Sequence, residues 1–300
     1  MSQPSGADLV ALNASFRRIL RAENKSERTV TAYTDAVRLL AGFLAQRGDP
    51  LTVTAVTRDH IAAFIADQLD RLKPATAHNR YRGLRAFFKW AVNEGELRVS
   101  PMVGMNPPQI PEEPPPVLGD DQLRRLLKAC EGRDFPARRD TAIIRLLMDT
   151  GIRVSECAGI VFDDLDLDDQ VVRVLGKGRR ERAVPFGRKT TLALDRYLRA
   201  RAGQPHAHLP NLWIGRAGAM TPSGVYQVVA DRGASVGLRL HPHQLRHTFA
   251  DSWLGAGGTE GDLMRLAGWK SRAMLDRYAK ATAERRAREA YRRMTLGDRI

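Results

Sequence analysis

Residues 105–118 read MNPPQIPEEPPPVL, with six prolines in fourteen positions. Proline has no backbone N–H to donate and fixes its own φ angle, so a stretch this rich in proline forms neither a helix nor a paired strand. We therefore expect an extended linker. It divides the 300-residue chain into residues 1–104 and residues 119–300, and each part is long enough to bury a core of its own.

Before this linker, apolar residues recur at helical spacing in four stretches. These stretches are residues 9–22, 29–47, 58–72 and 75–94. Ser26 and Thr76 stand near the starts of the second and fourth stretches, where a polar side chain can cap a helix. The sequence predicts a small all-helical domain in residues 1–104.

The charge of the chain favours a polyanionic partner. Lys and Arg number 48 against 34 Asp and Glu, which gives a formal net charge of +14. Because this charge is spread along the chain and not set beside an apolar anchor, nucleic acid is favoured over a membrane surface. A merely solvated basic surface is the alternative. In the fourth helical stretch the candidate DNA contacts are Arg80, Arg82, Arg85 and Lys89.

Nothing in the sequence indicates secretion or a membrane span. Residues 1–10 lack the basic and apolar regions of a signal peptide, and no apolar stretch approaches the length of about 18 residues that a span needs. Cys130 and Cys157 lie in apolar surroundings without metal-ligand spacing, so we expect buried free thiols in a reducing compartment. These features predict a cytoplasmic protein.

After the linker the periodicity is helical, then alternating, then helical again. Residues 120–130 and 139–150 are predicted helices, the first capped by Asp120 and Asp121 and the second ended by Gly151. Residues 170–175 and 182–186 alternate around a glycine-rich turn, which predicts a β-hairpin. From residue 190 onward the pattern is helical. The predicted fold class is mainly α with a small β-hairpin.

Two segments of this second part place charged groups where a plain structural element does not need them. TGIRVSE, residues 150–156, puts Arg153 at a helix junction, three residues from Glu156. Lys177 stands between two glycines at the expected hairpin tip, where it can deliver an ammonium group into a groove. Taken singly, each has an ordinary explanation: a surface ion pair and a simple turn.

Two further segments follow near the C-terminus. His243, Arg246 and His247 share one face if a helix begins near Pro242. Trp269 is followed nine residues later by Tyr278, which in isolation would be interpreted as a half-buried core residue.

A metal site is the alternative for the two histidines. They lack a third ligand at suitable spacing, and Arg246 between them would repel a cation. The acidic run at residues 163–169 fits a solvated turn better than a magnesium site. We expect neither a metal nor a cofactor.

Together and in this order, the segments TGIRVSE, LGKGRRERAVPF, HxLRHTFA and GW followed by the tyrosine resemble the catalytic boxes of the tyrosine recombinase, or phage integrase, family. The likeness spans roughly residues 120–290. The N-terminal helices resemble the family's SAM-like core-binding domain more loosely. The resemblance implies a two-domain DNA clamp, with the core-binding domain in residues 1–104 and the catalytic domain in residues 119–300.

The resemblance also implies roles for single residues. Tyr278 would attack the DNA phosphate and form a 3′-phosphotyrosyl link, which stores the bond energy so that rejoining needs no ATP. Arg153 and Arg246 would hold the phosphate oxygens, because a guanidinium stays charged and donates two parallel hydrogen bonds. Lys177 would protonate the departing 5′ oxygen, and Glu156 would brace the active-site arginine and histidine.

Three positions need separate comment. His243 is the candidate base for the tyrosine, whose phenol is a poor nucleophile at its ordinary pKa of about 10. Trp269 stands where the family commonly has histidine, and its indole can donate one hydrogen bond but cannot shuttle a proton. His247 is expected to pack or to orient its neighbours.

For the assembly, the resemblance implies a homo-tetramer on two double-stranded DNA sites, with exchange through a Holliday junction and possible accessory DNA-bending proteins. A C-terminal helix in residues 282–300 would dock on its own domain or on a neighbouring protomer. We expect integration and excision of mobile DNA. Xer-like chromosome dimer resolution, a type IB topoisomerase and a non-catalytic DNA-binding regulator are the alternatives.

Overall fold

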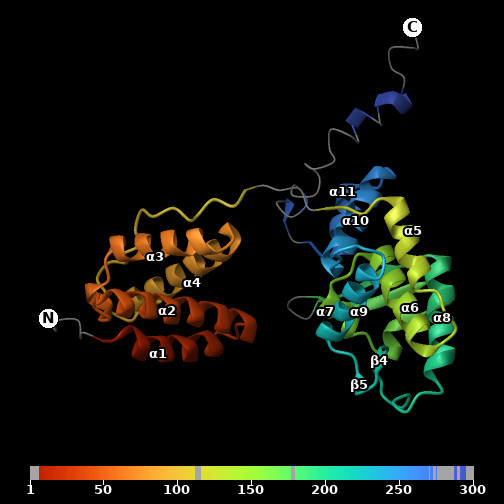
Figure 1. Ribbon diagram of the computed structural model, residues 1–300, viewed down its shortest axis with the longest axis horizontal. Coiled ribbons are helices and arrows are strands. Elements are labelled where there is room, and N and C mark those ends of the chain that lie inside the picture. The colour runs from red at the N-terminus through yellow and green to blue at the C-terminus, as the bar shows by residue number, and fades with distance from the viewer. Residues whose placement is uncertain are drawn as a thin grey trace, which may run out of the picture. The chain divides into compact units, whose positions relative to one another are not determined.

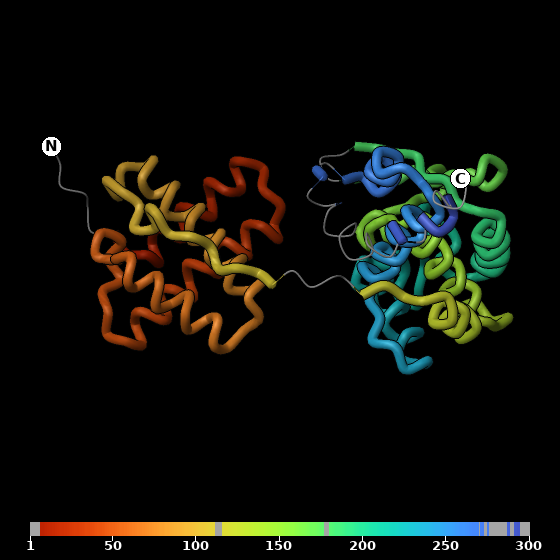
Figure 2. Tube along the Cα trace, turned by 90° about the horizontal axis from the view of Figure 1, so that it is seen from above, coloured from red at the N-terminus to blue at the C-terminus, as the bar shows by residue number. Residues whose placement is uncertain are grey.

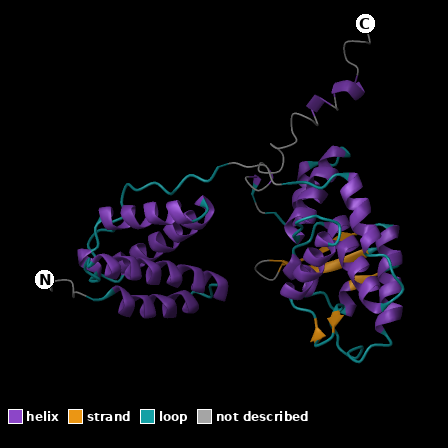
Figure 3. Cartoon of the chain, in the orientation of Figure 1, coloured by secondary structure: helices purple, strands orange, loops and turns teal. Residues whose placement is uncertain are grey.

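The chain divides into two units, Met1–Glu112 and Glu113–Ile300 (Figure 1). The computed structural model describes residues 7–111, 116–176, 180–269, 271–272, 275, 287–288 and 291–294. Figure 2 follows the chain through each unit. In the described residues, helices dominate both units and the strands lie in the second (Figure 3). The predicted fold class, mainly α with small β elements, is confirmed.

The first unit is built from four helices around one apolar core. Its helices are α1 (Leu9–Ala22), α2 (Glu27–Arg47), α3 (Arg58–Arg71) and α4 (Pro74–Asn93), with a short 3₁₀ turn at Val53–Ala55. Helix α2 packs against the other three. The core is rich in aromatic rings, and Phe16 meets Phe87 edge to face at 5.5 Å between ring centroids.

The two expected caps have different outcomes. Ser26 caps α2, since its hydroxyl accepts a hydrogen bond from the Thr29 backbone N–H at 3.3 Å. The prediction for Thr76 is wrong: α4 begins two residues earlier, at Pro74, with Lys73 in the N-cap position. Proline suits the first helical position because its φ is already helical and its missing N–H would have had no partner there.

The second unit begins with three helices and a three-stranded sheet. These elements are α5 (Asp120–Ala129), α6 (Phe135–Thr150), α7 (Val154–Ala158), a 3₁₀ turn (Phe162–Asp164), β1 (Leu165–Asp166), β2 (Val171–Gly176) and β3 (Arg180–Pro185). The capping prediction for Asp120 and Asp121 is wrong by one position, because Gly119 is the N-cap and both aspartates lie in the first turn. Helix α6 starts four residues before the predicted Arg139, where Asp134 accepts from the Ala137 N–H at 2.7 Å.

The three strands form an antiparallel sheet in the order β1-β2-β3. Val172 lies opposite Val184, and Gly176 lies opposite Arg180 next to the turn. Val172, Val174 and Val184 are buried, so one face of the hairpin joins the core. The predicted β-hairpin is confirmed, and its tip, residues 177–179, lies outside the described residues.

The rest of the unit is helical apart from one short hairpin. Its elements are α8 (Arg188–Arg201), β4 (Ile214–Gly215), β5 (Gly218–Ala219), α9 (Pro222–Ala234), α10 (Pro242–Gly255) and α11 (Glu260–Ala267). The β4–β5 hairpin interrupts a stretch predicted to be helical throughout.

The core of this unit contains a tryptophan whose indole N–H is hydrogen-bonded to the backbone. Trp213 is fully buried and donates its indole N–H to the Cys157 carbonyl at 2.9 Å. Cys130 and Cys157 are buried free thiols, as expected. Within the described part of the chain, no helix combines the length and the apolarity needed to cross a membrane.

Candidate active site

Arg153 and Glu156 are placed by a tight junction between α6 and α7. Gly151 ends α6 with φ at +58°, and a β-carbon there would lie 2.4 Å from the ring of Phe249, so the turn requires glycine. Arg153 follows as the N-cap of α7, and its backbone N–H donates to Glu156 Oε2 at 2.8 Å. Its guanidinium Nη1 donates to Glu156 Oε1 at 2.8 Å. The junction thus fixes both ends of this arginine.

Glu156 is the centre of a buried ion network. Its side chain is 3% exposed, and besides Arg153 it accepts two hydrogen bonds from Arg182 of β3, at 3.0 and 2.8 Å. Burial alone would raise the pKa of this carboxyl, but the bonds from Arg182 and Arg153 outweigh it and lower the pKa to about 2. Glu156 is therefore ionised at neutral pH and holds two guanidinium groups.

Arg246 comes from α10 and is 2% exposed. Its Nη1 donates to the Gly151 carbonyl at 2.5 Å, and its Nη2 donates to the Ala267 carbonyl at 2.6 Å. Its Cζ also lies 5.3 Å from the centroid of the Trp269 ring, a distance at which a cation is attracted by the aromatic face. These contacts fix the plane of the guanidinium between α6 and α11.

Three arginines meet at the C-terminal end of α11. Arg182 Nε donates to the Leu266 carbonyl at 2.8 Å, Arg246 donates to the next carbonyl, and Arg153 Nη2 reaches the Gly268 carbonyl at 3.5 Å. The last carbonyls of a helix lack partners within the helix, and the helix dipole makes this end negative. The three guanidinium groups donate hydrogen bonds to these carbonyls. Together with Glu156, we call these three arginines the arginine cluster.

The aromatic and histidine side chains adjoin this cluster. Trp269 is 5% exposed and packs with Leu254, Leu263 and Ala267. His247 is buried, His243 is exposed, and their ring centroids lie 4.2 Å apart in an edge-on arrangement. His243 and His247 therefore share one face of α10. No described group of three His, Cys, Asp or Glu side chains could hold a metal ion.

The structure brings together Arg153, Glu156, Arg246 and Trp269, which are up to 116 residues apart in the sequence. Lys177 and Tyr278 lie outside the described residues. The DNA-contact candidates belong to the first unit, on α4. There Arg82, Arg85 and Lys89 are exposed and Arg80 is half-buried.

Sequence reasoning missed Arg182, which joins the hairpin to both Glu156 and α11. A signal for it exists, because side chains two residues apart share one face of a strand. Arg182 therefore points the same way as the buried Val184. An arginine on the core side of a strand needs a carboxylate or carbonyl partner, but the sequence does not say which.

Comparison with known proteins gives concordant matches in both units. The "Phage integrase family" model matches residues 116–285, and the "Phage integrase, N-terminal SAM-like domain" model matches residues 14–95. The tyrosine recombinase XerC of Pseudomonas aeruginosa (strain LESB58) is 33% identical over 261 residues, which cover 81% of this chain and 82% of that protein.

Two further comparisons extend this picture. The tyrosine recombinase XerC of Azotobacter vinelandii is 37% identical over 201 residues, which are 66% of this chain and only 64% of that protein. A crystal structure of a lambda integrase tetramer bound to a Holliday junction has a TM-score of 0.70 at 20% identity, covering 88% of this chain and 78% of that one.

Proposed function

Because the chain belongs to the phage integrase family of tyrosine recombinases, which break and rejoin DNA at specific sites, we propose that Tyr278 is its nucleophile. The observation that carries this proposal is the arginine cluster at the end of α11. Two arginines there adjoin Trp269, and Tyr278 follows nine residues later. A phosphate bound at the cluster would be within reach of that tyrosine.

The two arginines would stabilise the transition state of phosphate attack. As the phenol oxygen bonds to phosphorus, negative charge builds on the nonbridging oxygens, and donors already in place lower the barrier. Arg153 suits this task because its side chain is 35% exposed while Glu156 holds it. Arg246 is oriented by two carbonyl groups. Neither needs to reorganise when the charge develops.

The remaining groups would manage protons. In the proposed step the phenol proton of Tyr278 passes to His243, a tyrosine–phosphate bond forms, and the bond to the 5′ oxygen breaks. Lys177 gives the departing oxygen its proton. Rejoining runs the same transfers backward. The Trp269 indole N–H would donate to a phosphate oxygen, and His247 would orient its neighbour His243.

For the assembly, we propose a homo-tetramer on two duplex sites that exchanges strands through a Holliday junction, with DNA-bending proteins as possible accessory factors. The similar lambda integrase structure, a tetramer on such a junction, supports this. Tyr291 and Met294 are 58% and 52% exposed, which suits a C-terminal helix that docks on a neighbouring protomer. Acting on DNA, the protein would work in the cytoplasm.

The biological role has two candidates. The sequence favours integration and excision of mobile DNA. Similarity to two XerC recombinases, at 33% and 37% identity, favours Xer-like chromosome dimer resolution. Either kind of enzyme would resolve a plasmid that carries two directly repeated sites. The deciding observation is therefore where the DNA site lies that the trapping experiment below recovers: in the host chromosome alone, or also at the end of a mobile element.

The nucleophile is tested by trapping the covalent adduct. The protein is incubated with nicked genomic fragments. When it cuts near a nick, the short piece of strand between the cut and the nick diffuses away, so rejoining is blocked and the protein stays linked to the DNA. The protein-linked DNA is then recovered and sequenced to give the site. We expect Tyr278→Phe to lose the adduct and the matched variant Tyr291→Phe to keep it. An adduct that persists in Tyr278→Phe would show that another residue attacks the phosphate.

A further inference from the structure

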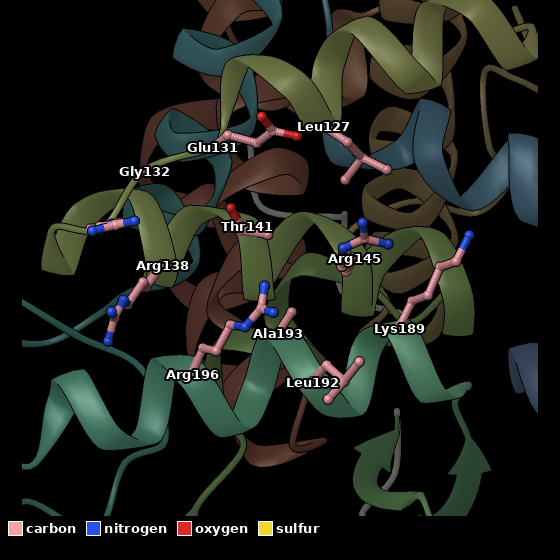
Figure 4. A pocket seen from close by; sticks show the side chains of 11 residues that line it. Leu127, Glu131, Gly132, Arg138, Thr141, Arg145, Lys189, Leu192, Ala193 and Arg196 are labelled. Atoms are coloured by element: carbon pink, nitrogen blue, oxygen red, sulfur yellow. The ribbon is translucent and has the colours of Figure 1, made fainter.

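A second basic site lies between α5, α6 and α8 (Figure 4). It is a pocket of about 710 Å³. Of its eleven lining residues, one is acidic, Glu131, and five are cationic. The cationic residues, which we call the pocket cations, are Arg133, Arg138, Arg145, Lys189 and Arg196.

Helix periodicity explains why these cations converge. Arg138 and Arg145 are seven residues apart on α6, and Lys189 and Arg196 are seven residues apart on α8. Residues two helical turns apart lie on one face, and α6 packs along α8. Two basic helix faces therefore border the same hollow, and Figure 4 shows these four side chains around it.

The pocket cations outnumber the acidic side chains in the pocket lining, where Glu131 is the single carboxylate. None of the five forms an ion pair with a described residue, although other arginines on the same helices do: Arg139 pairs with Asp140 at 2.8 Å and Arg199 with Asp195 at 2.8 Å. Five cations with one carboxylate among them create a local positive potential that attracts an anionic partner.

Part of the pocket wall is apolar. Leu127 and Ala193 line it, and Leu192 is 55% exposed on α8. An exposed leucine surrounded by cations suits a partner that carries both aliphatic and acidic side chains. A DNA backbone offers phosphates and sugars but no branched aliphatic side chain to cover Leu192.

We propose that this pocket is a docking site for an acidic segment of another protein, in which carboxylates pair with the pocket cations and an aliphatic side chain covers Leu192. The chain's own C-terminal segment does not fit, because residues 282–300 contain six arginines against three acidic residues. Helices α8 and α7 lie on opposite flanks of the unit (Figure 1). A protein bound at α8 would therefore lie away from Arg153, which is the N-cap of α7.

The test uses a fluorescent peptide of repeated Glu-Asp-Leu triplets, a matched peptide with serine for leucine, and a labelled DNA duplex. Each is titrated against the full chain and two charge-reversal variants. Arg196→Glu lies in the pocket, whereas Arg199→Glu makes the same charge change three residues away, at a side chain 67% exposed. We expect the leucine peptide to bind more tightly than the serine peptide, Arg196→Glu to weaken it about tenfold, and Arg199→Glu to leave it unchanged.

Two other outcomes would overturn the proposal. Equal weakening by both variants would mean that the peptide senses net charge and no particular pocket. A loss of duplex affinity in Arg196→Glu, with the two peptides bound alike, would assign the pocket to the DNA backbone. Lys189→Glu changes another exposed position of the same pocket. Both variants must retain the thermal transition of the wild type, which excludes misfolding as the cause of weaker binding.

Discussion

Replacing Arg182 by glutamine tests whether this residue holds the other side chains of the arginine cluster in position. The substitution removes two bonds to Glu156, at 3.0 and 2.8 Å, and one to the Leu266 carbonyl, at 2.8 Å. Removing one partner of a buried ion pair costs about 3–5 kcal/mol. Because Arg153 still pairs with Glu156, we expect the lower end, a loss of about 3 kcal/mol in the free energy of unfolding.

The catalytic effect should appear in the rate and not in DNA affinity. Arg182 would act through Glu156 and α11, so its loss lets Arg153 and Trp269 shift, and a displacement of about 1 Å can cost about 100-fold in rate. We expect single-turnover cleavage of a nicked site to slow by about 10- to 100-fold, with the dissociation constant for DNA unchanged. The pKa of Glu156 should also rise from about 2 toward its ordinary value of 4.5, which moves the acid limb of the rate profile to higher pH.

Arg182→Lys separates charge from geometry. Lysine keeps the positive charge beside Glu156 but cannot make the two-pronged contact, so it should restore part of the stability while the cleavage rate stays low. If Arg182→Gln cleaves at the wild-type rate, or if its DNA affinity falls by the same factor as its rate, the positioning role is refuted.

Two further predictions concern stability. Folding lowers the pKa of Glu156 from 4.5 to about 2, so its pairing contributes about 3 kcal/mol to the free energy of unfolding above pH 4.5, and this contribution is lost as the pH falls toward 2. Urea unfolding of Glu156→Gln between pH 6 and 3 should lack this pH dependence. A variant with the same pH dependence as the wild type would contradict the prediction. Gly151→Ala should lower the free energy of unfolding by about 3 kcal/mol, because it adds a clash with Phe249 to a left-handed backbone. Gly48→Ala, at φ +72° with no atom within 4 Å, should lower it by about 1 kcal/mol. Equal shifts in the thermal transition of the two variants would refute the role of the clash.

Local sequence signals predicted local structure well. The cap at Ser26, the glycine that ends α6 and the β2–β3 hairpin each depend on residues within a few positions, and all are present. The prediction for Thr76 failed because Pro74, two residues earlier, is an equally local and stronger start signal.

Long-range partners could not be predicted in the same way. Arg201 is 2% exposed and donates to the carbonyls of Ala207, Leu209 and Leu212, which no periodicity in α8 suggests. Arg182 is 84 residues from Leu266. The order of the motifs predicted a set of site residues, of which Arg153, Glu156, Arg246 and Trp269 lie together. The carbonyl groups that orient the arginines depend on backbone geometry, which a pattern of side chains does not encode.

The three arginines at the end of α11 also set a limit on reach. They hold the carbonyls just before Trp269, so the chain beyond that residue starts from a fixed anchor. Leu275, which is 1% exposed, packs in the same apolar cluster as Trp269. Tyr278 follows it by three residues, and three extended residues span at most about 10 Å. If Tyr278 is the nucleophile, as proposed above, a phosphate beyond this reach would need the tyrosine of another protomer, so the length of this tether would decide which subunit cuts which strand.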